Sequence, residues 1–391
     1  MTSPSFSVGL LALAVFATSA PPGAAESRVL VPELHHLRSC DPQAGGHVAR
    51  GFEAYAEAWR ASQIAQLQTA DSPEQGLAWL AKIGGKITRD AETPGSPSVS
   101  LDLDFTATGD ADLKNLASFP SVNKLYLNGS KVTDAGIHEL ARLAELQTLD
   151  LRATAVTGAT MNTLKELGRL ETLYLTRSAI DDAGLAQIAL LPHVTILNLR
   201  ATKITDRGLP SVATMKRLKT LNLTSTKITD AGLLRLAPLE QLETLYLNDT
   251  ATTDAGLALL PHLPRLQTLN LRGDAVTDAG LERLLALKEL RSLFLPSTQI
   301  TDAGLETLAP LKHLHTINLD NTAITDAGVK TLARFEKLET LSFSGSKITD
   351  VGLKELSGLR NLRWLDLRET AVSEGALQMF RRAQPKCHVE R

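Results

Sequence analysis

Aspartate recurs every 24 residues through most of this 391-residue chain, and four consecutive members of the column are Asp206, Asp230, Asp254 and Asp278. If these carboxylates lie near one another, a divalent cation could bridge them. A threonine precedes each of the four, which also fits the start of a helix, with the hydroxyl as N-cap and the carboxylate in the first turn. Because capping explains the column without an ion, we predict no metal site there.

The densest group of other metal-capable side chains lies near the N-terminus and consists of His35, His36, Cys40, Asp41 and His47. Its spacing matches no standard zinc pattern. The surrounding residues 26–50 contain few apolar side chains that could fix a ligand geometry. The sequence therefore favours a linker over a metal centre.

A thiol next to an imidazole, at Cys387 and His388, could form a nucleophile–base pair. Neighbouring residues of a strand point to opposite faces, however, so a partly buried structural cysteine is the better interpretation. Cys40 lies at the opposite end of the chain from Cys387, so we predict no disulfide. The sequence contains no phosphate loop, nucleophile elbow or metalloprotease helix. We expect a non-enzymatic protein without a cofactor, and an enzyme that uses the N-terminal segment is a remote alternative.

The elements that must carry these residues follow from the 24-residue period, which runs through about twelve units without an insertion. In each unit an L-x-x-L-x-L pattern, as at Leu218, Leu221 and Leu223, predicts a short strand with its leucines on one face. Apolar residues spaced by three then predict a short helical return, as at Leu233 and Leu236. One unit cannot bury its apolar face alone, so stacked units must share a core beneath one parallel sheet.

Two polar columns accompany the leucines. The first contains the predicted N-caps, which are Thr133, Thr157, Asp181, Thr205, Thr229, Thr253, Thr277, Thr301, Thr325, Thr349 and Ser373. The second is expected to bond exposed backbone where each strand turns away, and it consists of Thr106, Ser130, Thr154, Ser178, Thr202, Thr226, Thr250, Asp274, Thr298, Thr322, Ser346 and Thr370.

This pattern resembles that of leucine-rich repeat proteins. The I-T-D-A-G-L turn is similar to the cysteine-containing subclass found beside F-box domains, and the whole pattern resembles secreted bacterial proteins of that type. Here Thr or Ser replaces the subclass's Cys or Asn, and no F-box precedes the repeats, so a ubiquitin-ligase role does not carry over. The resemblance covers residues 99–385 and implies a right-handed α/β solenoid with a concave parallel sheet, short convex helices and a helical N-terminal cap.

The remaining segments give the expected domain boundaries. Residues 1–25, with an apolar run at 8–16, are expected to be a signal peptide, which predicts a secreted or periplasmic protein. Residues 26–98 are expected to form a linker and N-terminal cap, with helices over 51–67 and from Pro73 to Gly84 and strands at 86–89 and 99–104. Residues 386–391 should add a C-terminal cap strand, and Trp364, Met379 and Phe380 should close the core.

Composition excludes several kinds of partner. The 41 basic and 43 acidic residues give a net charge of −2, so nothing favours nucleic acid or an anionic membrane. Two cysteines cannot form a disulfide scaffold, and the apolar run at 8–16 is too short to span a membrane. We expect a monomer whose partner is a protein or peptide.

The expected binding residues are those interleaved with the strand leucines, since these positions vary while the leucines barely change. Tyrosine and arginine are the residue types that most often anchor interfaces. We predict one anchor cluster at Tyr126, Asp150, Arg152, Tyr174 and Arg200, and a second at Tyr246, Arg272 and Phe294. The predicted function is a non-enzymatic scaffold that binds a protein or peptide on its concave face. The alternatives are a structural or matrix protein whose inner side chains only solvate the sheet, and a substrate-receptor-like module.

Overall fold

The computed structural model describes residues 73–90 and 98–391. The expected signal peptide, the His/Cys cluster and the helix over 51–67 lie outside these residues. Within the described part of the chain, no helix is long and apolar enough to cross a bilayer.

One sheet of 14 strands contains the strands in sequence order. The first two, β1 (Lys86–Asp90) and β2 (Ser98–Asp102), pair antiparallel, and every later pair is parallel. The others are β3 (Val122–Tyr126), β4 (Thr148–Asp150), β5 (Thr172–Tyr174), β6 (Ile196–Asn198), β7 (Thr220–Asn222), β8 (Thr244–Tyr246), β9 (Thr268–Asn270), β10 (Ser292–Phe294), β11 (Thr316–Asn318), β12 (Thr340–Ser342), β13 (Trp364–Asp366) and β14 (His388–Glu390). This confirms the predicted twelve strands of the repeats and one further strand at each end.

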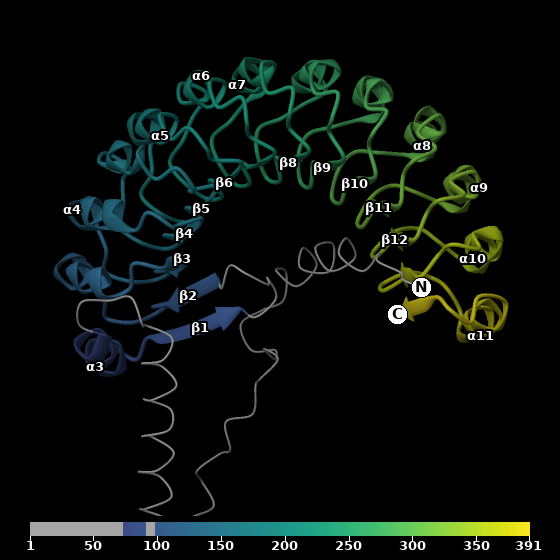
Figure 1. The fold of residues 1–391 in the computed structure, drawn as a ribbon. Coiled ribbons are helices and arrows are strands. Elements are labelled where there is room, and N and C mark those ends of the chain that lie inside the picture. Colours follow the sequence, from purple (N-terminus) through teal and green to yellow (C-terminus); the bar gives the residue numbers. More distant parts are fainter. Residues whose placement is uncertain (1–72, 91–97) are drawn as a thin grey trace, which may run out of the picture. The chain divides into compact units, whose positions relative to one another are not determined.

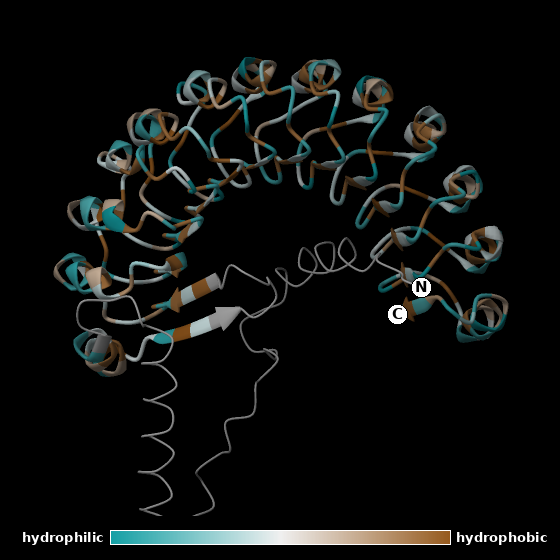
Figure 2. Ribbon diagram, in the orientation of Figure 1, coloured by the Kyte–Doolittle hydropathy of each residue, from teal (hydrophilic) through white to brown (hydrophobic). Residues whose placement is uncertain are grey.

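Short helical segments line the outer side of the curved repeats, while the strands line the inner side (Figure 1). The α-helices are α3 (Pro73–Ile83), α4 (Asp134–Ile137), α5 (Asp182–Ile188), α6 (Leu209–Val212), α7 (Asp230–Leu233), α8 (Asp302–Leu308), α9 (Asp326–Leu332), α10 (Asp350–Glu355) and α11 (Glu374–Ala383). The 3-10 segments are η3 (Asp110–Ser118), η4 (His138–Arg142), η5 (Met161–Leu164), η6 (Leu234–Leu236), η7 (Gly256–His262), η8 (Asp278–Ala286) and η9 (Leu356–Gly358). Each helical segment carries both polar and apolar residues (Figure 2), as expected when one side faces the core.

The core fills the space between sheet and helices. Strand leucines such as Leu149, Leu173 and Leu245 are fully buried, and their neighbours on the strand face the inner side. This confirms the predicted strand register. At the C-terminal end Phe380 is buried as expected, but Met379 is 67% exposed. The expectation that Met379 closes the core is therefore wrong, because it falls on the outward side of α11.

The aspartate column links each repeat to the next. Asp206, for example, accepts hydrogen bonds from the backbone N–H and the hydroxyl of Thr229, at 2.8 and 2.6 Å. The threonine hydroxyl in turn accepts from Ala231 N–H at 3.3 Å, which is the predicted N-cap bond. The same joint recurs from Asp110, Asp134, Asp182, Asp230, Asp254, Asp278, Asp302, Asp326 and Asp350. The column therefore connects repeats as well as favouring each helix start.

The glycine of the I-T-D-A-G-L turn leaves room for this joint. A Cβ on Gly232 would lie 2.1 Å from Asp206 Oδ1, and a Cβ on Gly304 would lie 2.2 Å from Asp278 Oδ1. Real Cβ atoms do not approach oxygen so closely. The motif therefore couples the aspartate of one repeat to the glycine of the next.

One joint departs from this pattern, and both of its partners change together. Gly158 stands where aspartate is expected, and Asp181 replaces the threonine of the following repeat. Asp181 caps α5 by accepting from Gly184 N–H at 3.0 Å. Thr157 was expected to cap a helix, but its repeat has only η5, which begins at Met161, and its hydroxyl donates to Asp134. The capping prediction fails at this residue because Gly158, with φ +91°, turns the chain away from a helix. It also fails at Thr205 and Thr253, since α6 and η7 begin later in their repeats, after Gly208 and Ala255.

The strand-ending column behaves as predicted in most repeats, but the prediction is wrong at Ser130 and Ser346, whose hydroxyl oxygens are buried without a hydrogen-bond partner. In eight repeats the hydroxyl donates to the carbonyl three residues earlier, as from Thr154 to Leu151 O at 2.7 Å. Asp274 is the acidic member of this column. Its Oδ1 accepts from the N–H and hydroxyl of Thr250, at 2.9 and 3.0 Å, while Oδ2 is buried without a hydrogen-bond partner. This burial raises the pKa of Asp274 to about 7.

Candidate functional site

The inner face of the sheet brings the predicted binding residues into register. Tyr126 pairs with Asp150, and Asp150 pairs with Tyr174, on neighbouring parallel strands. Tyr246 and Phe294 flank Asn270 in the same way on β8, β10 and β9. The two clusters predicted from the sequence are therefore each contiguous, and parallel pairing of equivalent residues is the reason.

Asparagine and aspartate on this face have a structural task that the sequence analysis missed. Asn198 Oδ1 accepts from the backbone N–H of Arg200 at 3.0 Å, two residues further along. The same bond recurs at Asp102, Asp150, Asn222, Asn270, Asn318 and Asp366. The detectable signal is an Asn or Asp as the last residue of the strand, two residues before the N–H that it accepts, since these side chains readily bond nearby backbone.

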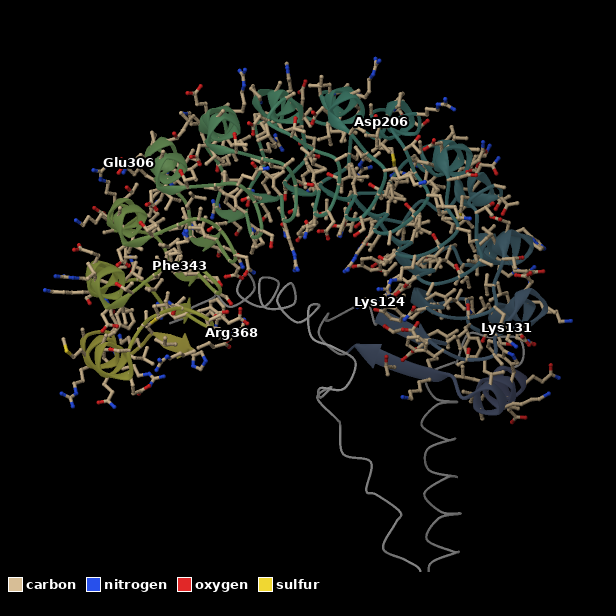
Figure 3. All side chains as sticks on the ribbon, turned by 180° about the vertical axis from the view of Figure 1, so that it is seen from behind. Lys124, Lys131, Asp206, Glu306, Phe343 and Arg368 are labelled. Carbon is tan, nitrogen blue, oxygen red and sulfur yellow. The ribbon has the colours of Figure 1, made fainter. Side chains whose placement is uncertain are left out.

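Arg152 is held by a carboxylate on its own strand. Its Nε donates to both oxygens of Asp150, at 2.9 and 2.7 Å, and Nη2 lies 2.5 Å from Oδ2. Asp150 is fully buried, whereas the Arg152 side chain is 41% exposed. The bond to Asp150 raises the pKa of Arg152 above its ordinary value. Arg368 is fixed to Asp366 in the same way near the C-terminal end, and Figure 3 places it on the inner side, away from Asp206 near the outer helices.

Arg200 and Arg272 occupy the same column as Arg152 but have no carboxylate beside them. Each follows an asparagine instead, and neither guanidinium forms an ion pair or hydrogen bond within residues 73–90 and 98–391. Arg200 is half-buried and Arg272 is exposed. Among the described residues, this column thus contains two neutralised arginines, Arg152 and Arg368, and two unneutralised ones, Arg200 and Arg272.

The predicted aromatic anchors differ in how much surface they present. Tyr126, Tyr174 and Tyr246 are half-buried, and burial raises the pKa of both Tyr174 and Tyr246. Phe294 is only 4% exposed. Phe294 and Asp150 therefore offer a partner almost no surface, and Asp150 contributes by holding Arg152.

The cysteine–histidine pair that could in principle react, Cys387 and His388, has a structural role instead. Cys387 is buried, and its Sγ donates to the His388 carbonyl at 3.6 Å, while the His388 side chain is exposed. Burial raises the pKa of the Cys387 thiol to about 11, which leaves no thiolate near neutral pH. No group of three or more metal-capable side chains comes together in the portion of the chain that the structure describes.

Comparison with known proteins agrees with the fold. Leucine rich repeat family models match residues 312–372, 191–213 and 216–237. The solved structure of an internalin (inlF) from Listeria monocytogenes is 20% identical, with 84% of this chain and 96% of that chain covered and a TM-score of 0.54. The chain therefore contains leucine-rich repeats, and its fold is a leucine-rich repeat solenoid.

Two further solved structures are similar over shorter or less closely superimposed stretches. Internalin C2 (inlC2) of Listeria monocytogenes is 27% identical over 61% of this chain and 85% of that chain, with a TM-score of 0.38. A leucine-rich repeat protein of Leptospira interrogans is 18% identical over 72% and 86%, also with a TM-score of 0.38. No curated protein matches the chain significantly.

Proposed function

We propose that the protein is a non-enzymatic scaffold that binds a protein or peptide on the inner face of its sheet. Curved solenoids present extended concave surfaces of this kind. The observation that carries the proposal is that Asp150, which holds Arg152, lies in register between two half-buried tyrosines, Tyr126 on β3 and Tyr174 on β5. A partner here would bury aromatic rings and meet a guanidinium that is already held in place.

Preorganisation makes Arg152 the best anchor of this cluster. Its Nε and Nη2 are committed to the buried Asp150, which limits the side-chain freedom that binding would otherwise remove. The hydrogens on Nη1 are left for a carbonyl or carboxylate of the partner. Tyr174 adds an amphipathic ring with few rotatable bonds, a property typical of interface residues.

The proposal also assigns roles to the chain ends. We propose that residues 1–25 direct export, so that the scaffold acts outside the cytoplasm, and that residues 26–98 provide a linker and the N-terminal cap. In support, α3 buries Leu77 and Leu80 at the N-terminal end of the core. Residues 386–391 would close the other end through β14, where Val389 is buried.

The test is capture of a native partner by purified protein, followed by a binding measurement with that partner. Tyr174→Ala combined with Arg152→Ala should weaken binding by ~2 kcal/mol or more, about thirtyfold. Because Arg152→Ala leaves the buried Asp150 without its partner, thermal melting checks that the variant is folded, and Tyr174→Ala alone, which leaves that pair intact, should weaken binding in the same direction. The matched control is Glu282→Ala with Arg283→Ala, two exposed neighbours on η8. If the inner-face variant retains every partner of the wild type, concave-face binding is refuted and a structural protein without a single partner takes its place.

A further inference from the structure

The two unneutralised arginines, Arg200 and Arg272, differ from the neutralised ones by a single preceding residue. In the D-L-R repeats, where the arginine follows Asp-Leu, the aspartate neutralises the arginine, as Asp150 does for Arg152. In the N-L-R repeats asparagine keeps the bond to the arginine N–H, at 3.0 Å from Arg200 and 3.1 Å from Arg272, but brings no charge. The backbone is thus satisfied in both kinds of repeat, and only the countercharge differs.

The surface between these two arginines is neutral and polar. The same column contains Thr224 and Asn248 on the intervening repeats, and Tyr246 lies beside them on β8. The one acidic side chain on the rim of this stretch is Asp249, which packs against Gly273 and makes no ion pair within the described residues. Asp274, the other acid near this stretch, is buried, and that burial keeps its carboxyl largely uncharged below about pH 7. The exposed charges are then two guanidiniums against one carboxylate, which leaves this part of the inner face positive and complementary to an acidic partner.

The spacing of the two guanidiniums fits an extended chain. Arg200 and Arg272 are three strands apart, which is about 14 Å at ~4.8 Å per strand. In an extended peptide, residues four apart point to the same side and lie ~13 Å apart at ~3.3 Å per residue. Carboxylates at positions i and i+4 of such a peptide would therefore each meet one arginine.

Asn248 favours an extended partner over a helical one. Its side-chain amide makes no hydrogen bond in the part of the chain that the structure describes, and its Oδ1 is shielded from solvent. Turning this amide toward a ligand would break no existing bond. An extended backbone offers free N–H and C=O groups to such an amide, whereas those of a helix are already paired.

We propose that the inner face between β6 and β9 binds an extended acidic peptide segment, with carboxylates four residues apart on Arg200 and Arg272. The inference rests on the concave-face function proposed above and names the partner's chemistry. Arginine suits this role because its planar group pairs with carboxylate through two parallel hydrogen bonds. The Asp-paired Arg152 and Arg368 would contribute less to acid selection, since each already has a carboxylate.

The experiment uses the full chain and fluorescein-labelled nine-residue peptides of serine, threonine and glycine with two glutamates, followed by fluorescence anisotropy at low salt. The first peptide has its glutamates at the third and seventh positions, the second has them adjacent, and the third has glutamine at both. The first should bind at least about threefold more tightly than the second, and more tightly again than the third. Its affinity should fall as salt is added.

Arg200→Gln and Arg272→Gln should each weaken binding of the first peptide about threefold or more, and the double variant should remove the preference for spacing. Arg368→Gln is the matched control, because it removes an arginine of the same column that Asp366 already neutralises, and it should leave binding unchanged. Thermal melting checks that each variant is folded. Equal binding of all three peptides, or equal loss in Arg368→Gln, overturns the proposal.

A single-stranded DNA oligonucleotide that binds more tightly than the first peptide, and depends on the same arginines, would overturn it in favour of a phosphate backbone. Failure of the acidic-segment inference can be told apart from failure of the concave-face function proposed above. If Tyr174 and Arg152 govern capture while the peptides show no dependence on spacing, concave-face binding stands and the acidic-segment inference fails. If the spacing preference holds while capture ignores Tyr174 and Arg152, the inner face still binds a partner, the acidic-segment inference stands, and the anchor role proposed for Tyr174 and Arg152 fails.

Discussion

The outer joints and the inner face of the same repeats follow opposite rules. At the outer side one contact, aspartate to the threonine and glycine of the next repeat, recurs with hydroxyl distances of 2.5–2.7 Å. On the inner face the residue between the strand leucines changes from repeat to repeat, with tyrosine, asparagine, aspartate, serine and phenylalanine all present. Residues that form the contact between stacked repeats must be the same in each repeat, because the contact has one geometry. Residues on the inner face can differ from repeat to repeat, because they meet solvent or a partner.

The difference shows where substitutions should act. A change in the joints or the core should alter the free energy of unfolding, because each repeat gains its stability from its neighbours. A change at an inner-face tyrosine, or at Arg200 or Arg272, which pair with no carboxylate among the described residues, should alter binding more than stability. Three measurements test this division, and each compares a framework position with a matched position outside it.

The largest effect is expected at β8, where neighbouring residues point to opposite faces. Leu245 is fully buried, so Leu245→Ala should cost ~2–5 kcal/mol of unfolding free energy. Tyr246→Ala should cost much less, because its ring is only half-buried on the inner face. Urea denaturation of both variants measures the difference. Equal losses would mean that the inner face belongs to the framework, and the division would collapse.

The next effect is a pH dependence at Asp274, where the strand-ending column contains an acid. Its pKa is raised from 3.8 to about 7 in the folded protein by burial, so the folded state holds its proton more tightly than the unfolded chain does. Stability is therefore lost as pH rises from about 4 to 7, by up to ~4 kcal/mol for a shift of roughly three units. Below pH 4 both states are protonated and the penalty disappears.

Asp274→Asn keeps an oxygen for Thr250 and removes the ionisation. It should stabilise the protein at pH 8 and have little effect near pH 4, as measured by urea denaturation across that range. Asp249→Asn is the control, since Asp249 is exposed. If the difference in unfolding free energy between Asp274→Asn and the wild type did not change with pH, ionisation of a buried Asp274 would not be what destabilises the protein at high pH.

The smallest effect is expected from a substitution in the aspartate–glycine joint between repeats. In Gly304→Ala the new Cβ would lie 2.2 Å from Asp278 Oδ1, so the joint must open, at a cost of ~1–3 kcal/mol. Gly168→Ala is the control, because nothing lies within 4 Å of its added Cβ. Thermal melts should show a lower melting temperature for the first variant and not for the second. An unchanged melting temperature in Gly304→Ala would mean that the joints do not hold the repeats together.

The fold could be predicted well from the sequence because each unit repeats the same leucine spacing and the same turn residues. The leucine spacing determined the strand register, and the Thr-Asp pair predicted helix starts that are confirmed at Thr133, Thr229 and Thr301. The partner of each aspartate could not be found in this way, since it lies 23 residues away and helix capping already explained the pair. Local signals are strong in a repeat, but they do not say which contacts cross between units.

The candidate site was predicted less completely, because exposure depends on neighbouring strands. Alternation with the strand leucines placed Tyr126, Tyr174 and Tyr246 on the inner face, their residue type marked them as anchors, and the strand register made the two clusters contiguous. Nothing in the sequence of β10 indicates that Phe294 is nearly covered, or that Asp150 is buried beneath its own arginine. Whether the clusters bind a partner stays a prediction.

The aspartate–glycine joint makes the chain a string of interchangeable modules. Because each unit offers an aspartate to the unit after it and receives one from the unit before, a gene segment of 24 codons can be duplicated or lost without leaving an unmatched end. Gly158 and Asp181 are the exception, since their repeats fit each other and not the common pattern. Evolution could thus change the length of the sheet in steps of ~4.8 Å everywhere except across that one matched pair.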